Sequence, residues 1–143
     1  MSKTPVSVFL LHLQIGEELA GGISCTMNLG VSTATKTVNG RSVVFQAVNP
    51  PLYVESIVTG KYNYLCTNVD CRIMIVLNGY AENANGTFKN FEARILLDED
   101  WSSGVANYSF YVNGEWHEMN NQKVTATENI EINDLKQLAA EAR

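Results

Sequence analysis

Apolar and polar residues alternate with a period of two through much of the chain, and this alternation restricts the chain to β-structure. In residues 23–31 the odd positions are apolar and the even positions are polar or glycine. Residues 91–97 repeat the pattern, with Glu92 and Arg94 on the polar face. Successive side chains of a strand point to opposite faces, so each segment predicts a strand with one buried and one solvated face.

Turn sequences separate these segments. Asn39-Gly40 and Asn113-Gly114 each lie between two alternating runs, which is the strongest signal for a type I′ hairpin turn. The Asn49-Pro50-Pro51 sequence ends another run, and Gly60 separates two more. About nine short strands with such turns are typical of a β-sandwich or a barrel. We expect an antiparallel β-sandwich.

Two segments, residues 6–13 and 73–77, are apolar on both faces. A sandwich normally buries only one face of each sheet, so the second face of these strands needs a cover. Soluble monomers rarely expose large apolar patches. We therefore expect a second copy of the chain to supply the cover, and a homodimer as the assembled state.

Only the C-terminal residues show helical spacing. In residues 131–143, Ile132, Leu135, Leu138 and Ala139 fall on one face. A helix of about ten residues is marginal alone in water, so it is expected to dock on the domain or on a partner chain. The sequence thus divides into a β-sandwich domain, residues 1–127, and a C-terminal helix, residues 128–143.

Charge and hydropathy exclude two classes of partner. The 143 residues carry 15 acidic and 10 basic side chains, a net charge of −5, which argues against sequence-independent nucleic-acid binding. Residues 8–13 form the longest nearly apolar stretch, far short of the roughly 20 residues of a membrane-spanning helix. Gln14 and Glu17 interrupt the N-terminal apolar run too early for an export signal, so we expect a cytoplasmic protein.

The cysteines predict neither a disulfide framework nor a metal site. There are three, and Cys66 and Cys71 flank a turn sequence that lets them face each other across a hairpin. We expect both to be reduced, as in a reducing compartment. No CxxC motif is present, and His12 and His117 are too far apart to complete a zinc site. No metal and no cofactor are expected.

No catalytic constellation stands out. Neither histidine has a recognisable nucleophile nearby and the chain has no GxSxG motif, so we expect no enzymatic activity. His12 is interpreted as structural and His117 as exposed. The acidic run at residues 98–100 matches no calcium-binding loop and predicts a solvated turn, with Trp101 folding back over it.

Aromatic residues supply the candidate binding site. We expect Tyr62, Tyr64, Tyr108 and Phe110 to lie in the core or in cross-strand pairs. Trp101, Tyr111 and Trp116 are the candidate ligand-binding residues. Rings of this kind serve protein interfaces, and with Asn and Asp they also suit carbohydrates. The sequence therefore predicts a non-catalytic binding or assembly module that self-associates, with a lectin-like carbohydrate-binding module as the alternative.

Four strings stand out together: TKTVNG (residues 35–40), QAVNPPL (46–52), GKYNYL (60–65) and LDEDWSSGVANY (97–108). This set resembles a small bacterial domain family of unknown function over about residues 5–118. The tail string DLKQLAAEA (134–142) is similar to a short helical element that often accompanies this domain. The resemblance implies a bacterial source and no assigned activity.

Overall fold

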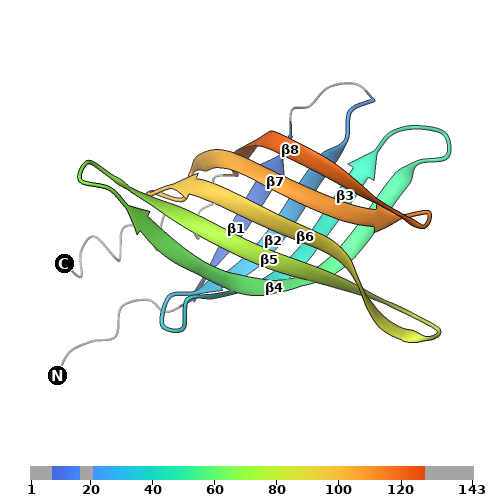
Figure 1. Ribbon diagram of the computed structural model, residues 1–143, viewed down its shortest axis with the longest axis horizontal. Helices are drawn as coiled ribbons and strands as arrows, with labels where there is room; N and C mark the ends of the chain where they lie inside the picture. The colour runs from blue at the N-terminus through green and yellow to red at the C-terminus, as the bar shows by residue number, and fades with distance from the viewer. Residues whose placement is uncertain (1–7, 17–20, 128–143) are drawn as a thin grey trace.

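The computed structural model describes residues 8–16 and 21–127. These residues form eight β-strands (Figure 1). The strands are β1 (Val8–Ile15), β2 (Ser24–Ser32), β3 (Thr37–Gln46), β4 (Leu52–Cys66), β5 (Cys71–Asn83), β6 (Gly86–Asp98), β7 (Ser103–Val112) and β8 (Glu115–Ala126).

The eight strands form one closed antiparallel barrel. Each strand pairs with its neighbours in the sequence, and β8 returns to β1. The all-β antiparallel prediction is confirmed, whereas the sandwich and the nine short strands are wrong. The reason lies in β4 and β5, which run for 15 and 13 residues straight through Gly60 and through Asn78-Gly79. A single sheet of long, twisted strands can curl until its first and last strands meet.

The barrel has two distinct ends (Figure 1). The β3–β4, β5–β6 and β7–β8 turns lie at one end, together with the connection from β1 to β2; we name it the Gly114 end. The β2–β3, β4–β5 and β6–β7 turns lie at the other, where β1 begins and β8 stops; we name it the Thr127 end. This division decides which candidate residues can meet.

Glycines inside the strands let the wall bend sharply. A Cβ atom on Gly40 would lie 2.0 Å from the carbonyl oxygen of Asn28, and one on Gly60 would lie 1.8 Å from that of Val76. Real Cβ atoms do not approach so closely, so only glycine fits where neighbouring strands curl together. The predicted turn at Asn39-Gly40 is therefore wrong, because both residues lie within β3 and pair with β2 and β4.

The other predicted hairpin turn is confirmed. Asn113 and Gly114 join β7 to β8 with φ values of 53° and 81°. A type I′ turn requires positive φ at both central residues. The same dipeptide signal was thus correct where the chain reverses and wrong at Gly40, where it does not.

The alternation of side chains sorts them between the barrel interior and its outer wall. In β1, Leu11, Leu13 and Ile15 are at most 1% exposed, while the outward-facing Val8 and Leu10 are 57% and 52% exposed. In β5 the inward Ile73, Ile75 and Leu77 are fully buried, and the outward Val76 is 42% exposed. The two strands predicted to be apolar on both faces thus lie in the barrel wall, four strands apart.

The expectation of reduced thiols at Cys66 and Cys71 is wrong, because a disulfide joins them. The two residues form a direct cross-strand pair at the end of the β4–β5 ladder, with their Cα atoms 4.0 Å apart. The Thr67 amide donates to the Asp70 carbonyl over 2.8 Å and closes the turn between them. The turn sequence between the two cysteines had indicated that they face each other. The register of β4 and β5 makes them direct cross-strand partners.

The predicted C-terminal helix and the second unit, residues 128–143, lie outside the described residues. Within the part that the structure describes, no helix has the length and apolarity needed to cross a membrane.

Gly40→Ala should lower the free energy of unfolding by about 2 kcal/mol or more, because its Cβ would overlap the Asn28 carbonyl. Gly30 on the neighbouring strand is the matched control, since a Cβ there meets its nearest neighbour, the Asn39 carbonyl oxygen, at 3.6 Å. Gly30→Ala should change the stability by less than about 1 kcal/mol. Urea unfolding of the three proteins measures both effects, and equal effects would contradict the close-approach explanation.

Candidate binding surfaces

Within the described residues the titratable side chains provide neither an ionised buried thiol nor a metal-binding group. Cys25 lies in the barrel core, and its burial raises the pKa of the thiol to about 12. It is therefore protonated at neutral pH and lacks the thiolate that a nucleophile requires. His12 is hydrogen-bonded through Nδ1 to the Asn28 side-chain oxygen on the outer wall. Among residues 8–16 and 21–127, no three His, Cys, Asp or Glu side chains are grouped to hold a metal ion.

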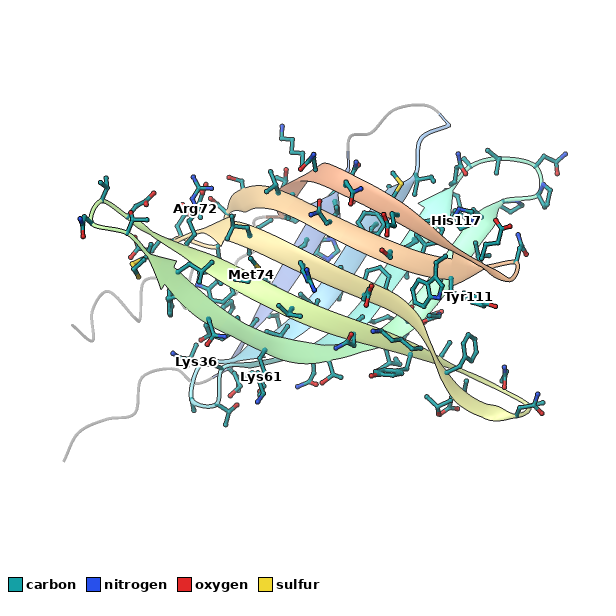
Figure 2. The ribbon with its side chains drawn as sticks, viewed as in Figure 1. Lys36, Lys61, Arg72, Met74, Tyr111 and His117 are labelled. Atoms are coloured by element: carbon teal, nitrogen blue, oxygen red, sulfur yellow. A yellow bond between two sulfur atoms is a disulfide. The ribbon has the colours of Figure 1, made fainter. Side chains whose placement is uncertain are left out.

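The structure brings two of the three candidate aromatic residues together. Tyr111 and Trp116 face each other across β7 and β8, with ring centroids 5.6 Å apart. Trp116 is 46% exposed, and the pair lies on the outer wall beside the Gly114 end (Figure 2). His117, the next residue along β8, is exposed as predicted and stacks on Phe110 at 5.3 Å.

Trp101 lies elsewhere. It is in the β6–β7 turn at the Thr127 end, separated from Tyr111 by the length of β7, about 30 Å for ten residues. Its ring packs edge-on against Phe9 and Tyr62, with centroid distances of 5.1 and 5.0 Å. Trp101 is thus a plug for this end of the barrel, and the three candidate rings do not share one surface.

The acidic run before Trp101 is exposed, as predicted for a solvated turn, and two of its carboxylates also accept hydrogen bonds. The Asp100 carboxylate accepts a hydrogen bond from the Ser102 amide at 3.1 Å, and the Asp98 carboxylate accepts one from the Ser103 hydroxyl at 3.1 Å. Both carboxylates therefore act as acceptors for nearby serines.

The aromatic residues predicted for the core divide between the interior and the rim. Tyr62, Tyr108 and Phe110 are at most 2% exposed, which confirms the prediction for these three. Tyr64 is 46% exposed at the Thr127 end, where it packs against Tyr62 and lies beneath the Lys36 ammonium group. Tyr64 takes the second of the two predicted placements, a cross-strand pair, since it lies opposite Ile73 on β5 where β4 extends past the filled part of the barrel.

The sequence analysis missed an open edge along β8. On one side β8 pairs with β7 over most of its length, but on the other it pairs with β1 only at Val124–Ala126. The Gly16 amide adds one hydrogen bond, to the Lys123 carbonyl, at 2.8 Å. Among the described residues no strand pairs with this side of Glu115–Gln122. Local periodicity carries no signal for such an edge, because it depends on the order and stagger of the strands.

A second missed feature is a basic–apolar face on the outer wall of β4–β8. Its centre is apolar, since Met74, Leu96 and Val105 are successive cross-strand partners and Val76 lies next to Met74 on β5. Val76 and Val105 are 42% and 48% exposed. Figure 2 shows Arg72 and Lys61 on either side of Met74. The residues of this face are Lys61, Arg72, Met74, Val76, Arg94, Leu96, Val105 and Lys123.

The cations of this face differ from the other strand cations in their pairing. Arg41 forms an ion pair with Glu55 at 3.1 Å, and Lys89 forms one with Glu92 at 2.9 Å. Within the described residues Lys61, Arg72, Arg94 and Lys123 have no salt bridge, although Asp98 lies opposite Arg72. The face therefore carries positive charge in a chain whose net charge is negative.

A third missed feature is a hollow across β1–β3 on the outer wall. It has a volume of about 380 Å³ and is mainly apolar. Gly30 leaves its floor without a side chain, while Leu10, His12, Asn39 and Thr127 contribute to its sides. We name it the Gly30 groove.

These features define the described chain as an eight-stranded up-and-down antiparallel barrel. The chain belongs to the family described as domain of unknown function DUF1842, whose model matches residues 6–116. No curated protein matches the chain. The predicted resemblance to a domain family of unknown function is thus confirmed.

Alkylation with iodoacetamide tests whether Cys66 and Cys71 are joined and whether the Cys25 thiol is inaccessible. Without reductant the native chain should take up no label, because Cys66 and Cys71 are joined and Cys25 is buried with a raised pKa. Reductant applied to the folded chain should allow two labels, and denaturation should then allow the third. Intact mass gives the count. Two labels taken up before any reductant is added would show the hairpin thiols to be free.

Proposed function

We propose that this domain is a non-catalytic binding module that associates with a second copy of itself through the open edge of β8. The observation that carries the proposal is the edge of Glu115–Gln122, which has no strand partner among the described residues. A strand edge presents a row of amide donors and carbonyl acceptors, and a second strand is the natural partner for them.

Two-fold symmetry suits this edge. Antiparallel pairing of β8 with β8 of a second copy is self-complementary, as an isologous interface requires. An axis at His117 places each Trp116 opposite Glu118 and each Glu115 opposite Met119, so that opposing side chains share one face of the sheet. This register keeps the carboxylates of the two copies from lying directly opposite one another, which would destabilise the pairing.

Trp116 supports association at the same place. It lies on the edge strand, and nearly half of its side chain is exposed next to Tyr111. Partly exposed tryptophan and tyrosine are typical anchors of protein interfaces, because burying their large rings contributes most of the binding free energy there. The main-chain pairing would set the orientation of the two copies, and the ring pair would add apolar contact area.

Carbohydrate binding remains the second candidate, on a smaller site than the sequence predicted. The exposed Tyr111–Trp116 pair, with Asn113 in the adjoining turn, supports it. Trp101 plays no part in such a site, because it lies at the other end of the barrel.

Static light scattering at micromolar concentration tests the association, and we expect a dimer. Trp116→Glu should weaken it by about tenfold or more, equivalent to about 1.4 kcal/mol, because a carboxylate is added beside Glu115 and Glu118. Ile57→Glu is the matched control. Ile57 is 55% exposed on the outer wall of β4, four strands from β8, and its substitution should leave the dimer intact.

Thermal melts of both variants establish that the barrel is folded. A monomer mass for the unaltered chain at high concentration would refute the self-association proposal. Equal dissociation by both variants would show that the dimer forms elsewhere. Retention of Trp116-dependent binding to a glycan array by a monomeric chain would instead favour the carbohydrate alternative.

A further inference from the structure

The basic–apolar face has the composition of a docking surface rather than of a solvated wall. Its centre places three apolar side chains in a row across three strands, Met74, Leu96 and Val105, and Val76 extends it along β5. Lys61, Arg94 and Lys123 lie at its borders without a salt bridge to any described residue. An exposed apolar patch with a polar rim marks an interaction site in soluble proteins.

The charge of the face selects the kind of occupant. A second copy of the same face would bring arginine and lysine side chains together, and this repulsion argues against symmetric pairing here. An amphipathic segment with acidic residues beside an apolar stripe is complementary instead. Residues 128–143 of this chain have that composition: Glu128, Glu131, Asp134 and Glu141 accompany Ile132, Leu135 and Leu138, with only Lys136 and Arg143 as cations.

The last described residues, at the end of β8, lie near one border of the face. The Ala126 amide donates to the Ser102 carbonyl at 2.7 Å, immediately before β7 begins. The Thr127 amide donates to the His12 carbonyl at 2.9 Å. Residue 128 therefore follows a point next to the first residues of β7, two strands from Met74. Four extended residues span about 13 Å, enough to reach the apolar centre from there.

We propose that residues 128–143 dock as an amphipathic helix on the basic–apolar face of the same chain. The helix predicted from the sequence is about 15 Å long for ten residues, and the five strands of the face span about 19 Å. Ile132, Leu135 and Leu138 cover the row of Met74, Leu96 and Val105. The acidic residues of the segment pair with the cations around that row.

The Gly30 groove is the competing site, because Thr127 itself contributes to its wall. That groove has no lysine or arginine among its lining residues, so it offers nothing to the four acidic side chains of the segment. Charge complementarity therefore favours the face on β4–β8 over the groove on β1–β3.

The methyl group of Met74 reports on the docking in the full-length chain. NMR of the chain labelled with [methyl-¹³C]methionine, with a neutral soluble gadolinium chelate added, measures how accessible each methionine methyl is. We expect the Met74 methyl to be shielded in the unaltered chain. The double substitution Leu135→Asp/Leu138→Asp should release the segment, shift the Met74 resonance and raise its relaxation to that of an exposed methyl. Met27, which is buried in the barrel, should not respond and reports that the fold is intact.

Gln137→Asp is the control for added negative charge, because it places one carboxylate on the opposite side of the predicted helix, whereas the double substitution places two on the apolar side. It should leave Met74 shielded. Arg94→Glu should expose Met74 as the leucine substitutions do, and combining it with Asp134→Lys should restore part of the shielding if opposite charges hold the segment.

Three outcomes would overturn the proposal. Met74 could be equally accessible in the unaltered chain and in the leucine variant. Gly30→Phe, which fills the groove on the other side of the barrel, could release the segment while Arg94→Glu does not. The shielding could also depend on protein concentration, which would identify a second copy as the occupant. None of these readouts uses the β8 edge, so the result is independent of the dimer measured by light scattering.

Discussion

The closure of the barrel depends on the short ladder between β1 and β8. Only Leu13, Gln14 and Ile15 pair there with residues of β8, whereas the β4–β5 ladder holds ten pairs. The inward side chains at this seam, Leu13, Ile15 and Val124, are fully buried. The seam is thus held chiefly by the packing of the common core behind it, since three cross-strand pairs contribute little by themselves.

The stagger of this ladder also creates the β8 edge on which the proposed association rests. Because β8 meets β1 only near its C-terminal end, its first eight residues extend past the seam with one edge free of any described strand. A barrel normally removes sheet edges altogether, which protects it from edge-to-edge association. Here β8 continues past the seam, so the described residues combine a closed, buried core with a strand edge that no described strand pairs.

Much of the fold could be predicted from local chemistry, while the closure could not. Period-two alternation correctly separated inward from outward residues, and Asn113-Gly114 correctly placed a hairpin. The prediction that the chain turns at Gly40 and breaks at Gly60 was wrong, because glycine is required both where φ is positive and where a neighbouring carbonyl approaches closely. The β8 edge and the cation cluster depend on which strands become neighbours, information that no single segment carries. The candidate residues Tyr111 and Trp116 lie side by side because they are cross-strand partners in the β7–β8 ladder. Trp101 is far from them because β7 carries the chain from one end of the barrel to the other.

The up-and-down order of the strands places the beginning of β1 and the end of β8 at the same end of the barrel. Among the described strands every ladder except the seam joins neighbours in the sequence, so the seam is the ladder whose strands lie farthest apart in the chain. Circular permutation, in which a linker joins the two ends and the chain is reopened at the Asn113-Gly114 turn, would convert the seam into a tethered hairpin. The entropic cost of bringing distant strands together would then apply to the β7–β8 ladder in place of the β1–β8 ladder. The permuted chain would form the same barrel, with β7 and β8 as the pair that closes it.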